Sequence, residues 1–141
     1  MSPKLKKPKG SPVLKADKPV EPDWDKECVI LTLKYIQYKE ECFSDWQKKE
    51  LAKFWDFNKR LHEMTWRQIF DTASKGKDKR GMAYTIVPRN KYKKVDFIKN
   101  LSSDIKMFEL RVDQEIRVHG FREKQFFHLC ILDRKHAICP E

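Results

Sequence analysis

The sequence predicts an α+β domain in which a hairpin of two helices packs on one face of an antiparallel sheet, in the order β-α-α-β-β-β. Three observations predict this class. Residues 27–38 are rich in β-branched and aromatic side chains, as in a strand. Residues 43–75 repeat apolar side chains at helical spacing, and from about residue 106 onward the apolar period is two. We expect residues 1–22 to be a disordered basic tail and residues 23–141 to form one domain.

The two predicted helices are defined by their caps and by an apolar face. Ser44 and Gln47 form a capping box ahead of the first helix. Thr65 and Gln68 repeat this pattern ahead of the second helix, and Gly76 is its predicted stop. The first helix is expected to bury a stripe made of Leu51, Phe54, Trp55, Asn58, Leu61 and His62. The segment AYTIVP, which follows the second helix, is a candidate short strand.

The charge of the chain indicates the class of its partner. The 141-residue chain has a formal net charge of +10, which favours a polyanion such as nucleic acid or an acidic protein. Residues 1–20 hold six Lys against one Asp, and residues 75–94 hold eight Lys and Arg against one Asp. We expect RNA contacts from the second of these segments and from the cationic run after the last strand, through Lys75, Lys77, Lys79, Arg80, Arg89, Lys91, Lys93, Lys94, Arg134 and Lys135.

The sequence also argues against a membrane protein and a secreted one. No stretch approaches the roughly 20 apolar residues of a membrane span, and no apolar segment of a secretory signal follows the basic N-terminus. The cysteines, which are Cys28, Cys42, Cys130 and Cys139, have no CxxC spacing. We therefore expect reduced thiols in a cytoplasmic protein.

The C-terminal strands predict where the cations of the sheet lie. A three-residue turn at 113–115 pairs Leu110 with Val118 and Arg111 with Arg117. A loop centred on Glu123-Lys124 pairs His119 with His128 in the next hairpin. The polar residues then share a face turned away from the helices, which we expect to be open. Its two rows are Glu109, His119 and His128, and Arg111, Arg117 and Cys130.

Two arginines that face each other across a strand pair destabilise the pair. An anion held between Arg111 and Arg117 would explain why the sequence places them there. The alternative is that they extend into solvent or pair with Glu109 and Glu115.

The order of elements and the stretch LRVDQEIRVHGF…FFHLCILDRKHAIC resemble the RelE/ParE toxin superfamily. The resemblance covers residues 27–139 as topology and residues 106–139 as motif. It implies a RelE-like fold and a metal-independent endoribonuclease that acts on mRNA at the ribosome. It also implies an antitoxin protein as the second member of a toxin–antitoxin pair. ParE-like members of the superfamily act on gyrase instead.

The resemblance also implies roles for individual residues. Arg111 and Arg117 match the sheet arginines that stabilise the transition state, and Arg134, Lys135 and His136 match the cationic run after the last strand. Cys139 stands where many members have Tyr, and His136 can serve in its place. Neutral His suits proton transfer near pH 7. The predicted catalytic residues are therefore Arg111, Arg117, His119 and His136.

Two other interpretations stay open at this point. One is a non-catalytic module that binds nucleic acid or protein on the same fold, because a fold does not determine a function. The other is a metal site, formed either by Glu109, His119 and His128 or by His128, Cys130, His136 and Cys139. Neither set has the spacing of a compact metal motif, and the nearby arginines would repel a cation. We expect no metal and no cofactor.

Overall fold

The computed structural model describes residues 21–37, 42–71, 81–93 and 95–140. Most of the predicted basic tail and the predicted helix stop at Gly76 lie outside these ranges. So do five of the predicted RNA-binding residues, which are Lys75, Lys77, Lys79, Arg80 and Lys94. The predictions for all of these residues stay predictions.

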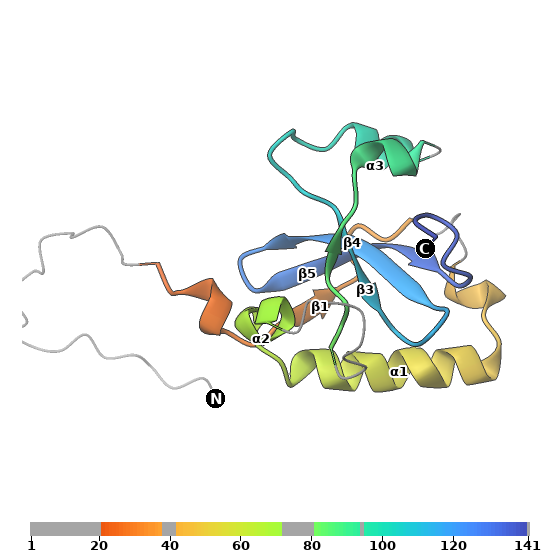
Figure 1. Ribbon diagram of the computed structural model, residues 1–141, viewed down its shortest axis with the longest axis horizontal. Helices are drawn as coiled ribbons and strands as arrows, with labels where there is room; N and C mark the ends of the chain where they lie inside the picture. Colours follow the sequence, from red (N-terminus) through yellow and green to blue (C-terminus); the bar gives the residue numbers. More distant parts are fainter. Residues whose placement is uncertain (1–20, 38–41, 72–80, 94, 141) are drawn as a thin grey trace, which may run out of the picture.

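The structure is α+β, as predicted, with a five-stranded sheet in the order β1-β5-β4-β3-β2 (Figure 1). Its elements, in chain order, are η1 (Trp24–Lys26), β1 (Ile30–Thr32), η2 (Phe43–Asp45), α1 (Lys48–His62), α2 (Trp66–Asp71), β2 (Thr85–Ile86), η3 (Arg89–Tyr92), α3 (Asp96–Lys99), β3 (Phe108–Arg111), β4 (Arg117–Glu123) and β5 (Phe126–Asp133). The candidate short strand and the three C-terminal strands are present, and the first strand is present but covers only Ile30–Thr32 of the predicted residues 27–38.

The sheet is mixed, so the prediction of an antiparallel sheet is wrong at one edge. β1 runs parallel to β5. The other three pairs, β2 with β3, β3 with β4 and β4 with β5, are antiparallel. A short hairpin forces its two strands to be antiparallel. No such hairpin joins β1 to β5, because α1, α2, α3 and three other strands lie between them in the chain.

One face of the sheet is covered by α1 and α2, as predicted. Phe54, Phe57 and Leu61 of α1 and Trp66 and Ile69 of α2 are buried in one core with the apolar residues of the strands. The predicted stripe is wrong for three of its members: Leu51 is 40% exposed, Trp55 is 72% exposed, and His62 is exposed as well. Phe57 completes the buried face in their place.

The caps agree with the prediction for one helix only. The side chains and backbone N–H groups of Thr65 and Gln68 bond reciprocally ahead of α2, as predicted. The predicted cap of α1 is one turn too early, because η2 occupies Phe43–Asp45. The backbone N–H of Gln47 instead donates to the carboxylate of Glu50, at 2.8 Å.

The second face of the sheet is covered as well, so the prediction of an open face is wrong. Figure 1 shows α3 on the side of the sheet opposite α1. The segment that carries η3 and α3 forms a second core with the strands, made of Val87, Tyr92, Val95, Ile98, Met107, Phe121, Cys130 and Ile131. The lysines of this segment favoured a solvent-exposed loop, but the apolar residues between them are numerous enough to cover the sheet.

The register of the first C-terminal hairpin is the predicted one. Leu110 pairs with Val118, and Arg111 pairs with Arg117. The carboxylate of Asp113 accepts the backbone N–H groups of Glu115 and Ile116, at 2.9 and 2.6 Å, and so closes the three-residue turn.

The predicted register of the second hairpin is wrong. His128 pairs with Phe121, and His119 pairs with Ile131. The turn is shorter than predicted because Lys124 adopts a positive φ of 56°, and the register then shifts between His119 and Gly120. A Cβ atom at Gly120 would lie 2.1 Å from the carbonyl oxygen of His128, so only glycine fits at this bulge.

Candidate anion-binding pocket above a buried histidine network

The second face carries a group of buried polar side chains under its covering layer. Glu109, Arg117, His119, His128 and Asp133 are all at least 90% buried. The exposed fractions of two predicted catalytic residues, Arg117 and His119, are 6% and 0%. Buried polar groups are costly without partners, so the contacts among these residues determine what the site can do.

His119 on β4 is the centre of the network. Its Nδ1 lies 2.8 Å from the hydroxyl of Tyr92, and its Nε2 lies 3.4 Å from Oδ2 of Asp133 and 3.7 Å from Oε2 of Glu109. Burial lowers the pKa of His119 and outweighs the opposing effect of Asp133. Because an ionised Asp133 can only accept, Nε2 of the neutral ring carries the proton and Nδ1 accepts from the hydroxyl of Tyr92.

Asp133 ends β5 and holds the segment that follows it. Its two carboxylate oxygens accept the backbone N–H groups of Ala137 and Ile138, at 2.8 and 3.0 Å. Burial works to raise the pKa of Asp133, but hydrogen bonds from His119 and from these two N–H groups outweigh it, so the pKa is lowered. The ionised carboxylate therefore fixes residues 137–138 against the sheet.

Glu109 and His136 form a second pair within this face. Oε1 of Glu109 lies 3.6 Å from Nε2 of His136. Burial raises the pKa of Glu109, although the charges of His136 and Arg117 work against the rise. Oε2 of Glu109 and Nε2 of His136 are buried and have no hydrogen-bond partner among the described residues. His136 also has a φ of +54°, a strained conformation for a residue other than glycine.

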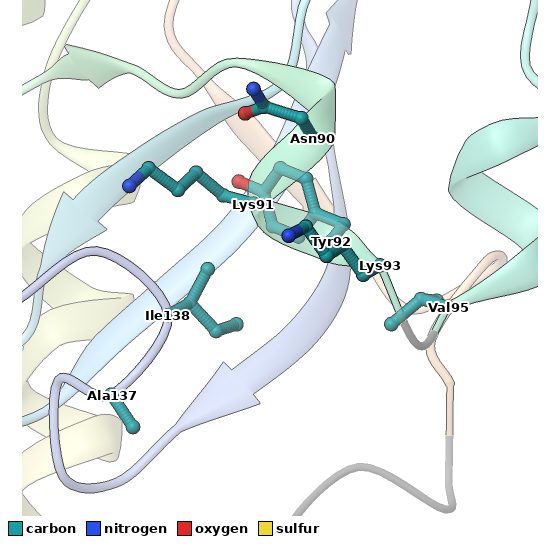
Figure 2. A pocket seen from close by; sticks show the side chains of 7 residues that line it. All are labelled: Asn90, Lys91, Tyr92, Lys93, Val95, Ala137 and Ile138. Carbon is teal, nitrogen blue, oxygen red and sulfur yellow. The ribbon is translucent and has the colours of Figure 1, made fainter.

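A pocket of about 430 Å³ lies beside this network, between η3 and the segment after β5. In Figure 2 the side chains of Asn90, Lys91, Tyr92 and Lys93 lie along one side of it, and Ala137 and Ile138 lie on the other side. Lys91 and Lys93 are exposed, whereas Tyr92 is buried and contacts His119. The pocket thus combines an apolar lining with two cations, which suits a planar group that carries a phosphate.

The other predicted site residues are engaged elsewhere. Arg89 donates to the carbonyl oxygens of Leu101, Ser102 and Ile105, and therefore holds a loop of the covering layer instead of facing an RNA. Arg134 forms a two-pronged ion pair with Glu50, at 2.9 and 2.7 Å.

The two sheet arginines likewise contact the backbone. Arg117 donates to the carbonyl oxygens of Asp113 and Ile116, at 2.7 and 3.2 Å. Arg111 is half-buried and donates to the carbonyl oxygen of Gly81, at 3.3 Å. Of the predicted RNA-binding residues that the structure describes, Lys91, Lys93 and Lys135 are exposed.

Sequence reasoning missed the roles of Tyr92 and Asp133. Tyr92 stands within the run KYKK, where the lysines suggested RNA contacts and drew attention away from one buried aromatic residue. Asp133 directly follows the apolar run of the last strand. An acidic residue directly after a strand can accept hydrogen bonds from the segment that follows, and this signal could have predicted the role of Asp133.

The two metal sites considered from the sequence are not assembled. His119 and His128 are not register partners, and Nδ1 of His128 lies 2.5 Å from the hydroxyl of Thr32. Over the described ranges, no three His, Cys, Asp or Glu side chains are grouped so that they could hold a metal ion. Within the same ranges, no helix is long and apolar enough to cross a membrane.

Comparison of the chain with protein-family models, with curated proteins and with solved structures found no match in any of the three.

Proposed function

We propose that the protein binds single-stranded RNA, with one nucleotide seated in the pocket between η3 and residues 137–138. The observation that carries this proposal is the placement of Lys91 and Lys93 beside an apolar pocket of about 430 Å³. Val95, Ala137 and Ile138 offer apolar surface to a base, and Asn90 offers an amide to its polar edge. The two ammonium groups neutralise the flanking phosphates.

The residues that contact the RNA in this arrangement differ from those that the sequence predicted. Arg117 and His119 are buried beneath the covering layer, so they support the pocket from below and do not contact the ligand. The chain of contacts from His119 through Tyr92 holds one wall, and that from Asp133 through Ala137 and Ile138 holds the other. Both walls of the pocket are therefore fixed to the sheet before RNA binds.

A second candidate function is metal-independent RNA cleavage of the RelE type, on a RelE-like fold. The proximity of the Glu109 carboxylate to Nε2 of His136 favours it, because a histidine beside a carboxylate is a common arrangement in general acid–base catalysis. His136 lies next to Ala137, which lines the pocket. An mRNA on the ribosome, a neutralising antitoxin and a cytoplasmic location belong to this candidate.

In this candidate reaction, His136 takes the proton of a 2′-hydroxyl group. The 2′-oxygen attacks the adjacent phosphorus, and the bond from phosphorus to the 5′-oxygen breaks. The 5′-oxygen keeps the electron pair and takes a proton from water, which leaves a 2′,3′-cyclic phosphate and a 5′-hydroxyl. Lys91 and Lys93 would hold the phosphate oxygens as their charge increases.

The binding proposal is tested by titrating a labelled 12-nucleotide RNA and following its fluorescence anisotropy. Three proteins of the full chain are compared: wild type, Lys91→Ala/Lys93→Ala and the charge-matched control Lys49→Ala/Lys59→Ala, whose exposed lysines lie on α1. We expect the pocket variant to bind more weakly and the control to bind like wild type. Equal weakening in both variants would show non-specific attraction and contradict the proposal.

Cleavage is tested separately with the same RNA and with an oligomer in which every 2′-hydroxyl is replaced by hydrogen. We expect wild type to cut only the RNA, with or without EDTA, and His136→Ala to lose this activity. RNA binding by the pocket without any cleavage would leave the binding proposal standing and remove the second candidate.

A further inference from the structure

The outer face of α1 carries an apolar stripe that the core does not use. Leu51 and Trp55 are one helical turn apart, and their exposed fractions are 40% and 72%. Ala52 beside them is exposed as well. We infer that this stripe is a docking surface for an acidic amphipathic helix of a partner protein. The inference does not rest on the proposed RNA-binding function.

The position of the stripe shows that it does not belong to the core. The buried residues of α1 are Phe54, Phe57 and Leu61, on the side of the helix that faces the sheet. Leu51 and Trp55 lie to one side of that face, at the surface. A contiguous apolar surface of this kind marks an interaction site more often than an isolated apolar residue does. Trp is also among the residues that contribute most to binding at protein interfaces.

A hollow of about 420 Å³ lies next to the stripe and can receive an apolar side chain of the partner. It is lined on α1 by Ala52, Lys53 and Asp56, and on the turn between β3 and β4 by Val112, Asp113 and Gln114. The small side chain of Ala52 contributes to both the hollow and the stripe. Together they offer a projecting Trp55 and a neighbouring recess, the two shapes that the apolar face of a helix can fit against.

Charge determines which kind of helix fits. Exposed Lys48 and Lys59 lie on either side of the stripe along α1, and Lys49 is exposed at the same end as Lys48. Lys53 and Arg60 already form ion pairs, with Asp113 at 2.9 Å and with Asp56 at 3.4 Å. A partner helix with acidic residues beside its apolar face would therefore meet lysines at both ends of the contact.

The same charges argue against a second copy of this chain as the partner. In a two-fold symmetric contact centred on the stripe, Lys48 at one end of the stripe would face Lys59 of the other copy, and these like charges repel each other. The span from Lys48 to Lys59 is eleven residues, about 17 Å at the rise of an α-helix. A partner helix of three turns would cover it.

The test uses three synthetic peptides of about 14 residues and the full-length, ¹⁵N-labelled protein. The first peptide has a leucine stripe flanked by Glu, the second has the same stripe flanked by Lys, and the third is a scrambled form of the first. The indole N–H signal of Trp55 is assigned from its absence in Trp55→Phe. Binding is followed through this signal and the amide signals of α1.

We expect the acidic peptide to shift the signals of Leu51, Ala52 and Trp55, and the other two peptides to leave them unchanged. Trp55→Ala should weaken binding of the acidic peptide by about tenfold or more, as for a central interface residue. Ile86→Ala, which removes an apolar side chain that is exposed on β2, should bind like wild type.

Three results would overturn the inference. One is that the acidic peptide leaves the α1 signals unchanged. Another is that the basic or scrambled peptide shifts them equally. The third is that single-stranded RNA, or a rise in protein concentration alone, shifts the Trp55 signal more than the acidic peptide does.

Discussion

The hydroxyl of Tyr92 lies 2.8 Å from Nδ1 of His119. Tyr92 lines the pocket, and His119 lies on β4 between two carboxylates, so this contact joins the candidate binding site to the buried network. Burial raises the pKa of Tyr92 well above its usual value, so the hydroxyl keeps its proton and remains a donor. The geometry of the pocket therefore depends on a hydrogen bond that is buried in the second core.

Removing this hydroxyl should destabilise the protein. Tyr92→Phe leaves Nδ1 of His119 buried without its donor, which should lower the free energy of unfolding by about 1–3 kcal/mol. Urea denaturation followed by circular dichroism measures the change. Tyr84→Phe is the control, because it removes a hydroxyl from a half-buried Tyr on the other face of the sheet. A Tyr92→Phe protein as stable as wild type would show that the contact contributes little.

The pH dependence of stability should report the neutral state of His119. Burial lowers its pKa from the ordinary value of 6.5, so the unfolded chain binds this proton more readily than the folded one. Stability from His119 is therefore fully present above pH 6.5 and is lost as the pH falls from there toward the lowered pKa. Glu109 acts in the opposite sense, because burial raises its pKa and its contribution is lost as the pH rises above the ordinary value of 4.5.

Comparing wild type with a His119 variant separates the contribution of His119 to stability from that of Glu109. We expect His119→Gln to lose less stability than wild type when the pH falls from about 7 to about 5, because Gln does not titrate. Unfolding free energies at several pH values for both proteins give this difference. Parallel curves for the two proteins would mean that His119 does not lose stability by protonation in this range.

The bulge at Gly120 should tolerate no side chain. Gly120→Ala places a Cβ atom 2.1 Å from the carbonyl oxygen of His128 and 2.7 Å from the ring of Phe127, both in the neighbouring strand. We expect a loss of about 1–3 kcal/mol or more, as for other overpacked sites. Lys124→Gly provides the contrast, since its positive φ of 56° suits glycine. It should unfold at the same denaturant concentration as wild type or a higher one, and equal losses in both variants would contradict this account of the bulge.

Local patterns in the sequence predicted the α+β class and one hairpin, because these features depend on neighbouring residues. The turn at 113–115 is closed by Asp113, and the register of Leu110 and Val118 follows from it. The second hairpin could not be predicted in the same way. Its register depends on the bulge at Gly120, where a glycine meets the backbone of His128.

The candidate site was predictable only in part. Lys91 and Lys93 were recognised by their charge, and His119 and His136 by their residue type. The burial of His119 could not be seen, because it results from the covering layer around Tyr92 and Val95, which lies far from β4 in the sequence. Whether a cation contacts a ligand or a backbone carbonyl, as Arg89 does, also depends on such long-range packing.

The salt dependence of RNA affinity tests the central claim most directly. Each phosphate contact on a single strand contributes about −0.7 to the slope of log K against log salt concentration. We expect Lys91→Ala/Lys93→Ala to make this slope shallower by about 1.4 relative to wild type and to Lys49→Ala/Lys59→Ala. An unchanged slope in the pocket variant would show that its two lysines do not contact the RNA backbone, and would contradict the proposed binding site.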